Sequence, residues 1–222
     1  MHVLDADGNG GRIIFRADDT CPFVRHVSMS EVDPAHLLLQ CRDRPANNQT
    51  DYHDFFELID LEGLVVRKFN TTSSKLDDPT LSPDGHYLAY WGSSDTDVEG
   101  YPGGAVFVLD LTSNQEPTQL TSTSGSRDTD PAWRPDSKTL AFSREKDDVK
   151  TVFKIKADGG KPKRLVGNAQ KPTWSTDGDS IVAVRKLPNK KVELIRFTKE
   201  GHAVTICSKP QRTIWAPAWS GR

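Results

Sequence analysis

The sequence predicts an all-β fold, a β-propeller made of four-stranded antiparallel blades, and three observations predict it. One motif recurs along the chain, apolar runs follow each copy in the same order, and 16 glycines and 14 prolines are spread between these runs. Repeats of about 40 to 50 residues in a strand-rich chain are typical of propeller blades.

The recurring motif holds a proline, then a tryptophan or leucine two residues later, then an aspartate turn. Its copies are residues 78–85, 130–137, 171–178 and 216–221, with a degenerate earlier copy at 27–34. The residue two positions after the proline is Leu81, Trp133, Trp174 or Trp219. We expect these large side chains to pack between neighbouring blades near the axis, where they bury much area, and not to take part in catalysis.

Three further strands are expected after each copy of the motif except the last, at 216–221. The predicted second strands are 87–91, 139–143 and 180–184, the third are 105–109 and 151–155, and the clearest fourth is 163–166. The glycine turn at 157–160 permits the positive φ of a tight hairpin. Four antiparallel strands per repeat, which we call a to d from the axis outward, are therefore expected.

The motif resembles the TolB-like, Pro-Asp repeat of β-propellers, in which Pro-x-Trp-Ser-Pro-Asp-Gly is followed by Leu-Ala-Phe and later by a glycine turn. The resemblance covers nearly the whole chain, and the same repeat occurs in the propeller of prolyl-oligopeptidase-type enzymes. It implies the propeller fold. It also implies a protein-binding role, because TolB-like proteins bind partner proteins in the bacterial envelope, although this fold carries many unrelated activities.

The repeats predict a single domain of residues 1–222. Its blades are expected at about 26–70, 78–121, 130–166 and 171–207, with a fifth blade shared by residues 216–222 and 1–16. Strands from both termini would close the ring and remove exposed sheet edges. The alternative is an open arc that belongs to a larger propeller.

Composition and motifs exclude several classes of function. A net charge of −2 argues against a nucleic-acid binder, and no apolar run is long enough to insert in a membrane. The chain lacks a Gly-x-Ser-x-Gly elbow, a Walker loop and a metal-ligand spacing among its six histidines. Residues 5–10 faintly resemble a calcium loop, but Arg16 stands where a glutamate ligand is required. No catalytic residue, metal or cofactor is therefore predicted.

The candidate binding site lies where the b–c and d–a connections share one end of the blades. The b–c loops are expected at 42–54 and 92–104, with shorter ones at 145–150 and 186–191, and long loops on rigid blades favour recognition. The candidate binding residues are Asp78, Asp130, Lys171, His53, Asp97, Tyr101 and Trp215. The alternative is that Asp78 and Asp130 only cap turns before proline.

The three cysteines bear on the compartment. Cys21 and Cys41 are expected to form a disulfide, which would close a loop of about 20 residues and contribute roughly 3 kcal/mol. Cys207 is expected to stay free. The pair favours an extracytoplasmic location, periplasmic or at the cell surface, while three reduced thiols in the cytoplasm remain the alternative.

Together these features predict a non-enzymatic module that binds a protein or peptide at the loop-rich end. It would belong to an extracytoplasmic bacterial protein, and the sequence leaves open whether it is a fragment of a longer one. The alternative is a carbohydrate-active propeller enzyme, or the accessory propeller of a peptidase. A carbohydrate-active site should gather histidines and acids at the channel mouth, whereas the histidines here occupy different positions in different repeats.

Overall fold

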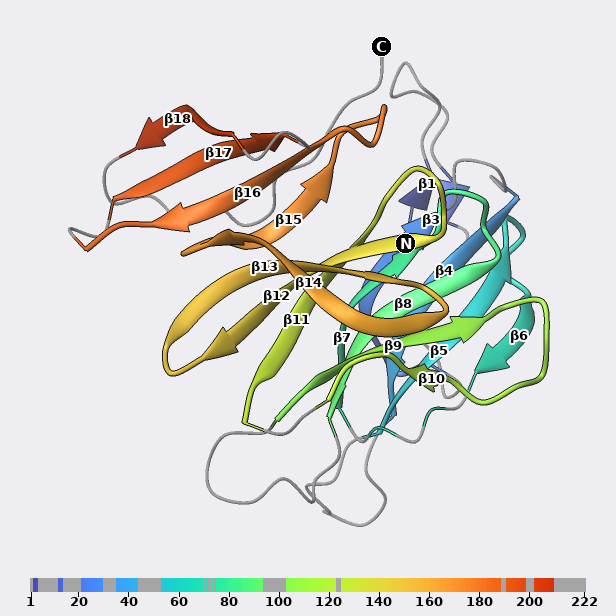
Figure 1. Cartoon of the computed structure of the whole chain (residues 1–222). Coiled ribbons are helices and arrows are strands. Elements are labelled where there is room, and N and C mark those ends of the chain that lie inside the picture. Colours follow the sequence, from blue (N-terminus) through green and yellow to red (C-terminus); the bar gives the residue numbers. More distant parts are fainter. Residues whose placement is uncertain are drawn as a thin grey trace.

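A computed structural model confirms the all-β fold. It describes residues 2–3, 12–13, 21–29, 35–43, 53–69, 71, 73, 75–93, 103–122, 125–188, 191–198 and 202–209. These residues form 18 strands and, within these ranges, no helix, so no described helix could cross a membrane. Figure 1 shows four sheets standing side by side in chain order.

Each sheet consists of four consecutive antiparallel strands, as a propeller blade requires. Blade 1 comprises β3 (Phe23–Met29), β4 (His36–Arg42), β5 (Asp54–Asp60) and β6 (Val65–Phe69). Blade 2 comprises β7 (Lys75–Leu81), β8 (Tyr87–Ser93), β9 (Ala105–Asp110) and β10 (Thr118–Gln119). Blade 3 comprises β11 (Arg127–Trp133), β12 (Thr139–Lys146), β13 (Val149–Lys156) and β14 (Gly159–Gly167). Blade 4 comprises β15 (Gln170–Trp174), β16 (Ser180–Lys186), β17 (Val192–Thr198) and β18 (Ala203–Lys209).

Near the N-terminus, β1 (His2–Val3) and β2 (Arg12–Ile13) form a separate antiparallel pair. The described part of the chain thus holds four complete blades and this pair, whereas five blades were predicted. Residues 216–222, including Trp219, lie outside the described residues. The blade shared by both termini, and the division of the chain into one domain, therefore stay predictions.

The connection between strands b and c of blade 3 is shorter than predicted. Residues 145–150 were expected to form a loop, but Glu145 pairs with Lys150 and Lys146 with Val149. Only Asp147 and Asp148 make the turn, with φ of 51° and 61°. Positive φ at both central residues is the geometry of a two-residue hairpin turn, which aspartate tolerates better than most residues.

The core lies between the blades. Phe56, Leu88 and Tyr90 form a buried cluster between blades 1 and 2, and Tyr90 stacks on Phe107 at 5.5 Å. Trp133 and Phe142 belong to the cluster between blades 2 and 3. Between blades 3 and 4 the buried cluster includes Val152, Val166, Ile181 and Ile195, with Trp174 packed against it. These contacts agree with the predicted position between blades for Trp133 and Trp174.

Candidate functional site

Three of the predicted residues meet at the axis of the blades. Asp78, Asp130 and Lys171 occupy the same position in three successive a strands, one residue before the motif proline. Each strand is bulged there: its register with strand b shifts between 77 and 80, 129 and 132, and 170 and 173. Proline has no N–H for the ladder, and a bulge accommodates it.

The backbone at these three residues is unusual. Their φ angles are 52°, 52° and 54°. These values lie in the left-handed region, which residues other than glycine, asparagine and aspartate seldom adopt. Lysine has no local hydrogen bond that would favour this conformation, so Lys171 is held there by the surrounding blades. Backbone strain of this kind concentrates at functional sites.

Side chains and backbone connect the three residues from blade to blade. The Asp130 N–H donates to Asp78 Oδ2 at 3.3 Å, and Lys171 Nζ lies 3.6 Å from Asp130 Oδ1. Together with Pro79, Thr80, Pro131 and Pro172 they line a pocket of about 170 Å³, which we call the axial pocket. It presents two carboxylates and one ammonium group within a small opening.

Burial, together with the neighbouring carboxylates of Asp130 and Asp77, raises the pKa of the Asp78 carboxyl to about 6. The backbone N–H of Asp130 and the charge of Lys171 oppose the rise without cancelling it. Near neutral pH, Asp78 therefore carries a negative charge that its surroundings compensate only in part. A cationic group from a ligand would balance the remaining negative charge of Asp78.

His26 lies near this level of blade 1, although sequence reasoning missed it. It stands three residues before Met29, as Asp130 stands three before Trp133, but His26 pairs with Gln40 and the bulge of its strand lies before it, between Val24 and His26. Partial burial lowers the pKa of His26, and the charge of Asp77 in blade 2 opposes this. Counting back three residues from the inter-blade position could have found it, but Val27 replaces the proline that marks the other copies.

The remaining candidates do not join the axial pocket in the described residues. His53 is exposed, and its N–H donates to Asp43 Oδ1 at 2.9 Å across the ends of β4 and β5. No hydrogen bond or ion pair of the described residues joins it to the three axial residues. Asp97, Tyr101 and Trp215 lie outside the described residues, so their place at the site stays a prediction.

Cys21 and Cys41 are joined by a disulfide between the start of blade 1 and the end of β4, with Cα atoms 5.2 Å apart. Both cysteines are fully buried with Leu37, Leu39, Phe55 and Ile59. The buried Glu57 carboxylate lies 3.9 Å from Cys41 Sγ. After reduction the two thiols and Glu57 could offer three ligands to a soft cation, which the disulfide withholds. Cys207 is free.

Two buried carboxylates stabilise the loop-rich end. Asp54 receives two hydrogen bonds from Arg42, at 2.6 and 2.9 Å, and accepts the Leu76 N–H of blade 2 at 3.1 Å. Asp128 receives two from Arg144, at 2.7 and 2.6 Å. Both carboxylates are fully covered, while the arginines stay partly exposed. These pairs are structural and position the strand ends around the axial pocket.

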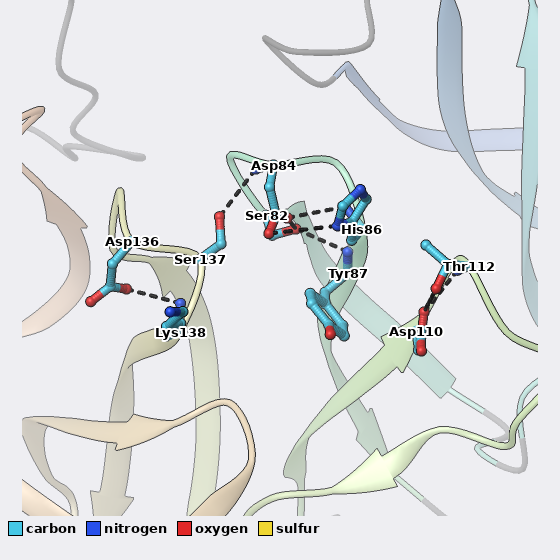
Figure 2. Close-up of polar contacts among 9 residues, drawn as sticks. All are labelled: Ser82, Asp84, His86, Tyr87, Asp110, Thr112, Asp136, Ser137 and Lys138. Carbon is cyan, nitrogen blue, oxygen red and sulfur yellow. Dashed lines mark hydrogen bonds and ion pairs between the residues drawn. The ribbon is translucent and has the colours of Figure 1, made fainter.

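The opposite end of the blades consists of the a–b turns, which Figure 2 shows for blades 2 and 3. Asp84 accepts the Ser82 hydroxyl at 2.6 Å and the His86 N–H at 3.1 Å. Partial burial alone would raise the pKa of Asp84, but these hydrogen bonds outweigh it and hold the pKa below its ordinary value. The Asp84 N–H also donates to Ser137 Oγ at 3.1 Å, which links the two turns. The motif aspartate therefore stabilises the turn.

Comparisons with known proteins agree with this architecture. The model of the TolB beta propeller domain matches residues 58–221. A relative from Bacillus subtilis, named as the uncharacterized peptidase YuxL, is 31% identical over 133 residues, which are 57% of this chain and 20% of the relative. The chain thus spans about a fifth of that protein's length.

Two solved structures share the fold at low sequence identity. A putative TolB from Agrobacterium tumefaciens superposes with a TM-score of 0.68 at 20% identity, over 93% of this chain and 68% of that one. An oligogalacturonate lyase from Vibrio parahaemolyticus gives 0.70 at 13% identity, over 93% and 59%. The recurring motif, the four-stranded blades and the matched family model lead to one conclusion: this chain belongs to the TolB beta propeller domain family.

Proposed function

We propose that this propeller is a non-enzymatic module that binds a protein or peptide segment at the axial pocket. The observation that supports this most is the arrangement of Asp78, Asp130 and Lys171, three charged residues from three blades held in left-handed backbone conformations around one opening. The rigid blades supply this position, and no single loop could create it.

The size and charge of the axial pocket favour a small part of a larger partner. A pocket of about 170 Å³ is below the roughly 300 to 1,000 Å³ of sites that enclose a whole small molecule. It suits the tip of one side chain or a chain terminus. Because Asp78 and Asp130 outnumber the single lysine, the group that enters would be cationic, such as a lysine side chain or an amino terminus.

The compartment we infer is extracytoplasmic, since the Cys21–Cys41 disulfide is of a kind that persists in oxidising environments. The partner would be a protein or peptide, with no role for nucleic acid and no insertion of this segment in a membrane.

A second candidate function has one specific observation in its favour. The relative named as a peptidase matches this chain over only a fifth of its length. The module could then be the accessory propeller of a peptidase, in which the axial pocket would hold a substrate peptide for a separate catalytic domain. Both candidates place peptide recognition at the same residues, and they differ in what lies beside the propeller.

The proposal is tested by capturing partners from a bacterial envelope extract on the immobilised propeller and identifying them by mass spectrometry. The double variant Asp78→Asn/Asp130→Asn should lose the captured protein. Glu116→Gln, an exposed carboxylate on blade 2 away from the pocket, should retain it. If the Asn double variant captures the same proteins as the wild type, the axial pocket is not the binding site.

A further inference from the structure

We propose that a cleft between blades 3 and 4 binds an acidic peptide segment that carries apolar side chains. The cleft has a volume of about 850 Å³, opens at the end of the a–b and c–d turns and shares no lining residue with the axial pocket. It is therefore a second site that the proposed function does not use. We call it the inter-blade cleft.

Part of the lining of the inter-blade cleft is apolar. Ile155 and Leu165 line it from blade 3, and Trp174, Ile181 and Phe197 line it from blade 4. The guanidinium of Arg134 lies 5.6 Å from the centre of the Trp174 ring. Clefts of this volume are typical of ligand binding, and this one combines apolar side chains with charged ones. The depth of the cleft thus suits aliphatic side chains.

Positive charge lines the opening on the side of blade 3. Four lysines line the cleft, namely Lys154, Lys156, Lys161 and Lys163, against only Asp158 and Asp179. Among the described residues, no acidic side chain forms an ion pair with any of the four. Arg134 is already paired with Asp136, at 2.6 Å. The cleft is therefore cationic in a chain whose net charge is −2.

The register of the strands strengthens this argument. Lys154 on β13 lies directly opposite Lys163 on β14. Like charges at directly opposed positions destabilise a sheet, so the pair is unfavourable for folding alone. An anionic ligand over the two lysines would remove the repulsion.

The lining favours a peptide over an anionic polysaccharide. Lysine ammonium groups are separate point charges, which match carboxylates spaced along an extended chain. Of the two aromatic residues in the lining, Trp174 has the Arg134 guanidinium over its ring, which leaves Phe197 as the other flat face. The aliphatic residues Ile155, Leu165 and Ile181 offer no flat face for a sugar ring, but they pack well against leucine or valine side chains of a peptide. The Trp174 N–H is buried without an acceptor among the described residues, whereas Trp133 donates to Thr80 O at 3.0 Å. The unbonded donor marks the junction at Trp174 as less completely packed than the one at Trp133.

The test uses fluorescence anisotropy with the full chain and a labelled synthetic peptide of Glu-Glu-Leu repeats. The wild type should bind it, and binding should weaken as salt is raised. The variant Lys154→Glu/Lys163→Glu should bind at least about tenfold more weakly. Lys146→Glu/Lys186→Glu makes the same change in net charge at the other end of blades 3 and 4, on exposed residues, and should bind within about twofold of the wild type.

Further variants and control ligands separate binding at the cleft from misfolding and from binding at the axial pocket. If Lys154→Glu/Lys163→Glu fails to fold by circular dichroism, the exposed pair Lys156→Glu/Lys161→Glu replaces it with the same expectation. Asp78→Asn should leave this binding unchanged, which separates the cleft from the axial pocket. The inference is overturned by no binding of the wild type, by equal loss in both Lys→Glu pairs, or by equal binding of Lys-Lys-Leu or Glu-Glu-Ser peptides. Tighter binding of a uronate oligosaccharide than of the acidic peptide would also overturn it.

Discussion

The junction between blades 2 and 3 resembles the junction between blades 3 and 4 at the loop-rich end, but the two differ at the end of the a–b turns. At the loop-rich end both have the same backbone contact: Asp128 N–H donates to Gly104 O at 2.9 Å, and Ala169 N–H donates to Lys150 O at 3.0 Å. Towards the a–b turns, Trp133 is buried with its N–H bonded, while Trp174 is half-buried beside the inter-blade cleft. One repeat therefore builds both a closed core and an open cleft.

One residue of the turn explains much of this difference. Ser82 and Ser175 direct their hydroxyls back to the aspartate of their own turn, at 2.6 and 2.5 Å. Blade 3 has Arg134 at this position, and its Nε donates to Gly178 O of blade 4 at 3.0 Å. A long side chain between the two turns keeps them apart. The motif thus determines where blades meet, and single side chains determine how closely they pack.

The largest expected effect concerns the buried pair of blade 3, which blade 4 lacks. In Arg144→Met, Asp128 would stay buried without its partner, and the free energy of unfolding should fall by about 3 to 5 kcal/mol in urea titrations. Blade 4 has Ala169 and Arg185 at the corresponding positions. Arg185→Met should therefore change stability little. Equal losses in both variants would contradict the distinction between the blades.

The next effect separates a like-charge contact from an opposite-charge contact. Asp78 faces Asp130 at one junction, whereas Lys171 faces Asp130 at the next. Because the folded-state pKa of Asp78, about 6, lies above the ordinary 3.8, folding favours the protonated form. This contribution is fully present below about pH 4 and is lost as the pH rises through about 6.

Asp78→Asn removes this pH dependence. At neutral pH its free energy of unfolding should exceed that of the wild type by up to about 3 kcal/mol, and the gain should vanish below about pH 4. Asp84→Asn is the control with the opposite sign: its pKa is lowered by hydrogen bonds, so the variant should be less stable than the wild type at neutral pH. Thermal melts of both variants and the wild type between about pH 4 and neutral pH measure these differences. A loss of stability in Asp78→Asn at neutral pH would contradict the raised pKa of Asp78.

A smaller effect compares the two tryptophans directly. Trp133→Phe leaves Thr80 O without its donor and should lower the free energy of unfolding by about 1 to 2 kcal/mol beyond the loss of ring area. Trp174→Phe removes a donor that has no acceptor among the described residues, so only the loss of area remains. Paired urea titrations measure the difference. If the two variants lose the same stability, the junctions do not differ in the way described.

The smallest effect tests the contact between turns at the inter-blade cleft. Gly178 and Gly125 have nearly equal φ, 70° and 69°, so alanine should cost about 1 kcal/mol at each for the backbone alone. A Cβ at Gly178 would lie 2.9 Å from Arg134 Nε, whereas at Gly125 no described residue other than its chain neighbours lies within 4 Å of one. Gly178→Ala should therefore lower the melting temperature further than Gly125→Ala.

Much of the fold could be predicted from sequence because the repeat places a proline, a large side chain and a turn at fixed intervals. The same signal located Asp78, Asp130 and Lys171, which the blades bring together at the axis. It could not reveal the inter-blade cleft, since Trp133 and Trp174 follow the same motif and differ only in their neighbours across the junction. Nor could it show that Lys154 and Lys163 are opposed, because that register depends on a bulge between Lys154 and Lys156.

The use of consecutive strands in every blade has a consequence for how the chain folds. Each sheet forms from residues close in sequence, so a blade can assemble as soon as it leaves the ribosome, without waiting for distant segments. The disulfide joins β4 to the residues just before β3, so it can form as soon as the first hairpin exists. Oxidation would then secure blade 1 before blades 2 to 4 are complete, and the blades would fold one after another along the chain.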